Sequence, residues 1–92
     1  MSAAYRDKAK ASVQRHWPVA ESLDSLTFTQ AHGLATDMNT VASTKNPRES
    51  VSTYRELRQR STESSDNHAA IKSLITRLSQ LIDPVNDLDL KE

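Results

Sequence analysis

The chain contains no cysteine among its 92 residues, which excludes a disulfide framework, a cysteine-based zinc site and a thiol nucleophile. Its single glycine, Gly33, has no second glycine with which to form a phosphate-binding loop or a Gly-x-Ser-x-Gly nucleophile elbow. The histidines His16, His32 and His68 do not stand at the spacing of metal ligands. We therefore predict that the protein is not an enzyme and has no catalytic residue, metal, cofactor or small-molecule substrate.

Large apolar side chains are scarce as well. Val, Ile, Leu and Phe together number eighteen, and Phe, Trp and Tyr together only four. A chain this short buries about 60 to 65% of its unfolded surface, so its core must be thin. Ser and Thr are frequent, whereas glycine and the aromatic residues, which β-sheets and their turns need, are few. This composition favours an all-α fold.

No apolar run approaches the ~18 residues that cross a bilayer, and the first residues lack the apolar stretch of a signal peptide. We therefore expect a cytoplasmic protein that does not bind membranes. Its net charge is zero, but this is the sum of opposed blocks. The balance is +3, −3, +3, 0 and −3 over residues 1–20, 21–44, 45–60, 61–82 and 83–92. Such alternation favours antiparallel helices, or copies that pair head to tail.

Helix signals divide the first half of the chain. A stripe at four-residue spacing predicts an N-terminal helix that starts after Ser2 and ends before Pro18; its members are Tyr5, Ala9, Val13 and Trp17. A short second helix is expected through Leu23 and Leu26. Thr27 and Gln30 match a capping box, which starts a helix that we predict to reach about Thr44. Gly33 inside it indicates a closely approaching backbone or a local irregularity.

The sequence Asn46-Pro47-Arg48-Glu49 predicts another helix start, with Asn46 as the cap and Glu49 completing a capping box. A heptad seam then runs towards Pro84 through Tyr54, Leu57, Ser61, Ser64, His68, Ile71, Ile75, Leu78 and Ile82, widened by Leu74 and Leu81. Either one helix of about 36 residues covers the stretch, or it breaks at Ser64–Asn67, where four residues favour helix caps. We favour the continuous helix.

We therefore predict one helical domain over residues 1–84, followed by an acidic C-terminal tail over residues 85–92. The fold is an all-α antiparallel bundle of three to four helices, or an extended helical hairpin with a long C-terminal helix. The hairpin turn lies at Lys45-Asn46-Pro47 in both cases.

The functional prediction is an interaction module that binds another protein, itself, or both, in the manner of an adaptor, chaperone, assembly subunit or inhibitor. The seam has more large aliphatic residues than the preceding helix has apolar residues to cover them. Part of the seam is therefore predicted to face a partner; the alternative is that all of it lies in an intramolecular core. Trp17 is either a core anchor or a partner-binding anchor. The predicted partner-binding residues are Trp17, Tyr54, Leu57, Ile71, Leu74, Ile75, Leu78, Leu81 and Ile82.

The alternative function is a small nucleic-acid-binding regulator that uses a basic strip between Lys45 and Arg60. Its phosphate contacts would be Lys45, Arg48, Arg55 and Arg58. Glu49 and Glu56 interrupt this strip, and nucleic-acid binders usually neutralise about 6 to 10 phosphates. The sequence therefore favours a solvated basic face and a protein partner.

Overall fold

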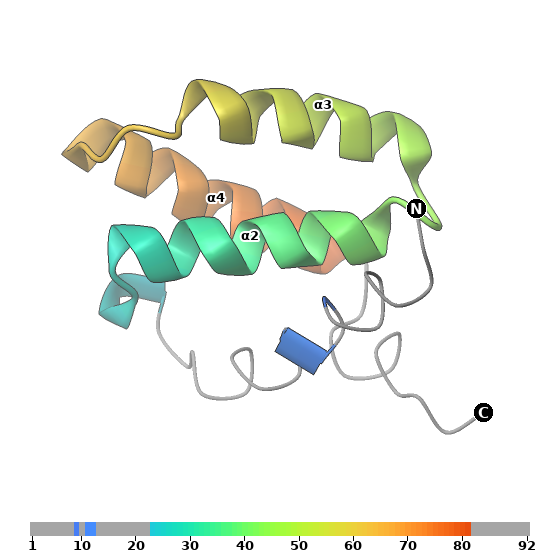
Figure 1. Cartoon of the computed structure of the whole chain (residues 1–92), viewed down its shortest axis with the longest axis horizontal. Helices are drawn as coiled ribbons and strands as arrows, with labels where there is room; N and C mark the ends of the chain where they lie inside the picture. Colours follow the sequence, from blue (N-terminus) through green and yellow to red (C-terminus); the bar gives the residue numbers. More distant parts are fainter. Residues whose placement is uncertain (1–8, 10, 13–22, 82–92) are drawn as a thin grey trace.

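The structure, a computed structural model, describes Ala9, residues 11–12 and residues 23–81. Residues 23–81 form three α-helices and one 3-10 turn, residues 9, 11 and 12 are also helical, and the described residues contain no strand, which confirms the all-α class (Figure 1). The elements are η1 (Leu23–Ser25), α2 (Phe28–Ala42), α3 (Pro47–Gln59) and α4 (Ser65–Leu81). Most of the predicted N-terminal helix, with Tyr5, Val13 and Trp17, lies outside the described residues, as do Ile82 and the tail 85–92.

Helix α2 begins at the predicted capping box. The backbone N–H of Gln30 donates to Thr27 Oγ1 at 3.1 Å, and the N–H of Thr27 donates to Gln30 Oε1 at 3.0 Å. These two bonds satisfy amides that the first helical turn would otherwise leave unpaired. After Ala42 the chain turns, because the N–H groups of Lys45 and Asn46 donate to the carbonyl of Ala42 at 3.0 and 2.8 Å.

Asn46 and Pro47 connect α2 to α3, but not by the predicted cap. Pro47 occupies the first turn of α3 as expected, whereas the Asn46 side chain makes no capping bond, so the predicted box with Glu49 is wrong. The Asn46 amide Nδ2 donates instead to the carbonyl of Leu81 at 3.2 Å, at the far end of α4. This hydrogen bond connects the turn to the last residue of a helix that is distant in sequence.

The favoured continuous helix over residues 47–83 is wrong, because α3 ends at Gln59 and α4 starts at Ser65. Ser64 caps α4, its Oγ accepting from the N–H of Asn67 at 3.1 Å. Asn67 also holds the connection from its side chain: Nδ2 donates to the carbonyl of Thr62 at 2.6 Å, and Oδ1 accepts from Arg60 Nη1 at 3.4 Å. The structure has the alternative, a break next to the cap-forming residues Ser64–Asn67. Because of this break the chain has no long C-terminal helix of the kind that the extended hairpin requires.

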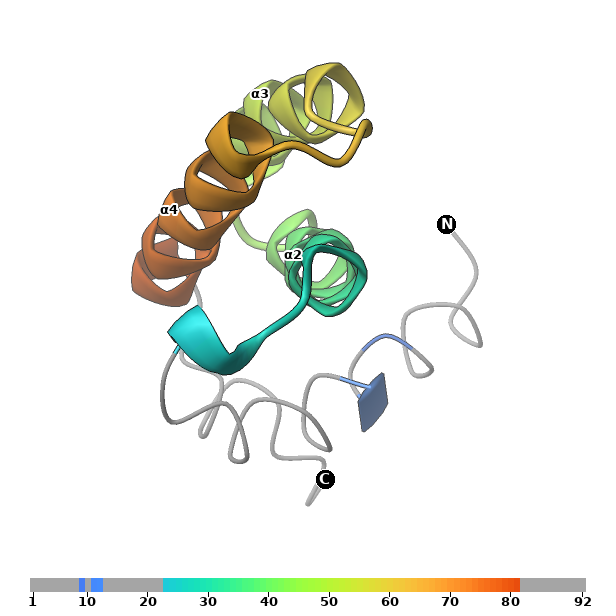
Figure 2. The ribbon, with the colours of Figure 1, turned by 90° about the vertical axis from the view of Figure 1, so that its left-hand side faces the viewer.

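Helix α2 lies against both α3 and α4, so it is the centre of the arrangement (Figures 1 and 2). The buried core residues on these three helices and beside them are Ala9, Phe28, Ala31, Leu34, Ala35, Met38, Val41, Ala42, Leu57, Ile71, Leu74, Ile75 and Leu78. Leu57 is the sole large aliphatic that α3 contributes to this cluster within the described residues. The core is therefore built mainly between α2 and α4.

Two histidines add polar connections between elements. Nε2 of His68 on α4 lies 2.9 Å from the carbonyl oxygen of Leu26, and Nε2 of His32 on α2 lies 3.3 Å from that of Leu57. A carbonyl only accepts, so Nε2 of each ring is the donor. Phe28 lies between the rings, with centroid distances of 5.9 Å to His32 and 6.2 Å to His68. The ring cluster fixes the entry to α2 against α4 and the end of α3.

Gly33 has neither of the predicted explanations. Apart from its own helical turn, a Cβ atom built on it would meet no atom of the described residues within 4 Å, and α2 continues through it as a regular helix. Among the described residues, no helix has both the length and the apolar character to cross a membrane.

We expect Gly33→Ala to raise the free energy of unfolding by about 1 kcal/mol, because alanine loses less backbone entropy in a helix and has room here. Chemical denaturation followed by circular dichroism measures the change. An unfolding midpoint at or below that of the wild type would contradict the open environment of this position.

Ile75→Asp should lower the free energy of unfolding by at least about 3 kcal/mol, because Ile75 is fully buried and would be replaced by an unpaired charge. Arg58→Ala is the control, since Arg58 is exposed and its loss should change stability by less than about 0.5 kcal/mol. Similar losses for the two variants in thermal denaturation would count against this core assignment.

Candidate functional site

The structure buries most of the seam that was predicted to bind a partner. Leu57, Ile71, Leu74, Ile75 and Leu78 are at most 2% exposed in the single chain. Leu81 is partly buried and packs against the same core. In the single chain these side chains form the intramolecular core, which is the alternative that the sequence left open. A role for them in binding a partner stays a prediction.

The reason for this burial lies in the small residues of α2. Ala31, Ala35 and Ala42 are fully buried beside Met38, and short side chains let a neighbouring helix approach closely. Counting only large side chains on α2 therefore underestimated how much of α4 it covers. The apolar seam of α4 is used to fold the chain.

Helix α3 has a different and more polar underside. Its buried residues are Ser50, Thr53 and Leu57, and its backbone is joined to α2 by Asn39 Nδ2, which donates to the carbonyl of Ser50 at 3.2 Å. Within the part of the chain that the structure describes, three buried oxygens at this interface have no hydrogen-bond partner: Asn39 Oδ1, Ser50 Oγ and Thr53 Oγ1. Leaving a buried polar group unpaired costs roughly 1–3 kcal/mol, so the interface of α3 with α2 is the weaker one.

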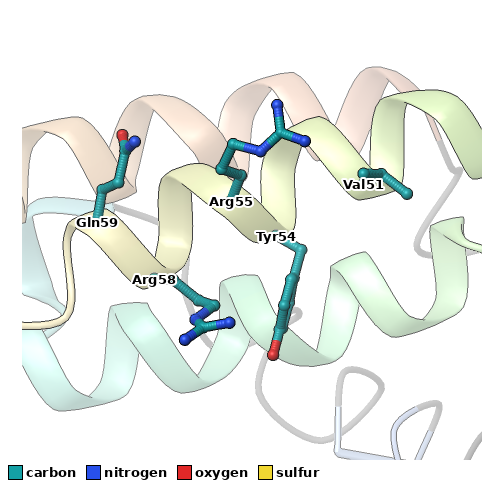
Figure 3. A pocket seen from close by; sticks show the side chains of 5 residues that line it. All are labelled: Val51, Tyr54, Arg55, Arg58 and Gln59. Atoms are coloured by element: carbon teal, nitrogen blue, oxygen red, sulfur yellow. The ribbon is translucent and has the colours of Figure 1, made fainter.

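The opposite side of α3 exposes large side chains. Val51 is 58% exposed and Tyr54 is 53% exposed, and in the described part of the chain they are the exposed large apolar residues. Together with Arg55 and Arg58 they occupy positions i, i+3, i+4 and i+7, which form one face of a helix. Figure 3 shows these side chains along the helix. We call Arg48, Val51, Tyr54, Arg55 and Arg58 the α3 outer face.

Tyr54 and Arg58 form a ridge on this face. The Arg58 guanidinium carbon lies 5.9 Å from the centroid of the Tyr54 ring, within the range of a cation–π contact. Both residues line two shallow hollows. The outer hollow is lined by Val51, Tyr54, Arg55, Arg58 and Gln59 (Figure 3). The hollow towards α2 is lined by His32, Thr36, Tyr54, Leu57, Arg58 and Ser61.

The charges of the outer face are available to a ligand. Arg48, Arg55 and Arg58 are exposed, and none forms an ion pair within the described ranges. Glu56, which the sequence places among them, pairs instead with Arg77 of α4, Nη2 to Oε2, at 2.8 Å. Lys45, the fourth residue of the predicted basic strip, is also exposed. The arginines of the strip therefore lie on the same face as Tyr54, whereas Glu56 points towards α4.

Val51 is the residue of this face that sequence analysis did not single out, because it lies off the heptad seam. Its signal was a large aliphatic three residues before Tyr54 on a helix otherwise rich in polar residues. Trp17 and Ile82, also predicted to bind a partner, lie outside the described residues.

The described residues contain no group of three or more His, Asp or Glu side chains placed to hold a metal ion. The two described histidines, His32 and His68, both donate to backbone carbonyls, a structural use of the ring. The outer face of α3 is therefore the candidate functional site, and it is suited to binding.

No protein-family model, curated protein or solved structure matches this chain. The function is therefore argued from the outer face itself.

Val51→Ser and Tyr54→Ser should each lower the free energy of unfolding by less than about 1 kcal/mol, because both side chains are more than half exposed. Leu57→Ser on the same helix should cost about 3 kcal/mol, since it removes a buried aliphatic side chain. Urea denaturation of the three variants makes the comparison. A loss at Val51 or Tyr54 as large as that at Leu57 would show that these residues serve the fold.

Proposed function

We propose that the protein is a small non-enzymatic interaction module that binds a partner protein through the α3 outer face. The observation that carries this proposal is the exposure of Val51 and Tyr54 beside Arg55 and Arg58, which make no ion pair in the described residues. Tyrosine and arginine are enriched in the centres of protein interfaces, where they combine large contact areas with directed polar groups. Exposed side chains of this kind have little role in folding.

The remaining helices supply the scaffold in this proposal. An antiparallel bundle, in which α4 is held on α2 by the aliphatic seam, fixes the position of α3 through the short turn at Asn46 and Pro47. The module then acts by occupying a surface on its partner, as an adaptor, chaperone, assembly subunit or inhibitor does. Binding needs no rearrangement of the core.

A second copy of the chain fits the outer face less well than another protein does. Pairing two copies face to face would bring Arg48, Arg55 and Arg58 of one against the same residues of the other. Like charges across an interface oppose association unless carboxylates intervene. We therefore propose a different protein as the partner.

The nucleic-acid alternative is the weaker proposal. Lys45, Arg48, Arg55 and Arg58 are all exposed. Four cations fall short of the about 6 to 10 contacts that usually carry such binding, and Val51 lies among them. The apolar component of the face favours a protein surface.

Photocrosslinking tests the proposal at single positions. A benzophenone amino acid replaces Tyr54 in the full chain in its native host, and the same group at Ser73, an exposed residue of α4, is the matched control. We expect one protein to be crosslinked from position 54 and not from position 73. The purified partner should bind the wild type at least about tenfold more tightly than it binds Val51→Ser or Tyr54→Ser, as expected for residues at an interface centre.

Equal crosslinking from both positions, or a purified partner that binds Val51→Ser and Tyr54→Ser as tightly as the wild type, would contradict the proposed site. A crosslink to nucleic acid in place of protein would favour the alternative function.

A further inference from the structure

The charges of α3 are sorted between two sides of the helix. At about 100° of rotation per residue, Arg48, Val51, Arg55 and Arg58 lie on the side opposite the buried Ser50, Thr53 and Leu57. The carboxylates of α3 lie elsewhere: Glu49 and Glu56 share the edge on which Glu56 meets Arg77 of α4. The outer face is therefore cationic, although the segment as a whole contains acidic residues.

Each arginine of this face can accept a carboxylate from outside the chain. A guanidinium binds a carboxylate through two parallel hydrogen bonds, and in the described residues Arg48, Arg55 and Arg58 have no such partner. Arg48 and Arg55 are two turns apart, about 10 Å along the axis, and Arg58 lies one further turn on. Carboxylates spaced one and two turns apart on a second helix match these intervals.

The apolar part of the face also fits a helix. Val51 and Tyr54 lie between Arg48 and Arg58 along α3, and the ridge formed by Tyr54 and Arg58 has a shallow hollow on each side. Helices pack by placing the side chains of one between the side-chain ridges of the other, with their axes about 8–10 Å apart. A row of aliphatic residues on the second helix would fill the hollows, and acidic residues beside that row would reach the arginines.

We propose that the segment which binds the α3 outer face is an acidic amphipathic helix of the partner protein. This inference rests on the proposed function and adds the chemistry of the partner. A second copy would present the same cationic face and would repel the arginines. A nucleic acid would leave Val51 and Tyr54 without apolar contacts. Neither therefore matches both the charged and the apolar residues of the outer face.

The test uses two synthetic peptides of about eighteen residues, long enough to form helices in water. Both carry the same row of leucines; one has glutamate at the flanking positions and the other has glutamine. Each is titrated into the full chain labelled with 15N, and a random-sequence DNA duplex is titrated in parallel. We expect the acidic peptide to shift the amide resonances of residues 48–58, and to bind at least about tenfold more tightly than the glutamine peptide, with an affinity that falls as salt is added.

Charge variants locate the effect. The double substitution Arg55→Gln and Arg58→Gln should weaken binding of the acidic peptide at least about tenfold and leave binding of the glutamine peptide unchanged. Arg77→Gln is the matched control, because it removes a positive charge that already pairs with Glu56 outside the outer face. It should leave the affinity for the acidic peptide within about twofold of the wild type.

The outcomes separate this inference from the proposed function. Equal affinities for the two peptides, with shifts confined to residues 48–58, would overturn the acidic partner and leave a protein-binding face. The absence of shifts with either peptide would overturn the inference, while crosslinking at position 54 tests the function independently. Tighter binding of the duplex than of the acidic peptide would overturn both in favour of nucleic acid.

Discussion

The packing of the aliphatic stripe of α4 on α2 is the interaction on which the rest of the structure depends. Ile71, Leu74, Ile75 and Leu78 are buried there, and each such side chain contributes about 1.5–3 kcal/mol when removed from water. The sum is comparable to the whole net stability of a small domain, about 5–15 kcal/mol, which is what remains after the entropy cost of folding, so loss of this packing would unfold the chain. Since the chain has few other large apolar residues, α3 is left with a polar underside and can direct Val51 and Tyr54 outward without loss of the core.

Sequence analysis succeeded where the deciding signal is local. The capping box of Thr27 and Gln30 and the proline at the start of α3 both involve residues within one turn, and both are observed. It failed where a distant group decides. The Asn46 side chain does not cap α3 as expected, because it donates a hydrogen bond to the carbonyl of Leu81, 35 residues away. The break before α4 was visible as a row of cap-forming residues, yet the heptad spacing continues through it, and Asn67 and Arg60 secure the break by contacts that spacing does not reveal.

The candidate site was predicted only in part, because distant contacts also decide which of its residues are exposed. The spacing of Tyr54 and Leu57 places both in one seam, but only Leu57 faces the core. Leu57 is 2% exposed, whereas Tyr54 is 53% exposed. Which member of a seam faces the core depends on the height and angle of the neighbouring helix, here α2 with its alanines. The arginines were identified from sequence, but their separation from Glu56 follows from its ion pair with Arg77, a tertiary contact.

Native-state hydrogen exchange tests the central claim, that the seam between α2 and α4 holds the fold while α3 is attached more weakly. The amides of Met38 and Ile75 should exchange only through global unfolding, with the same opening free energy as denaturant unfolding. The amides of Tyr54 and Leu57 in α3 should exchange through a local opening of lower free energy, because one large aliphatic side chain and three unpaired polar oxygens lie at its interface with α2. Opening free energies in α3 equal to those of α2 and α4 would contradict this division of the structure.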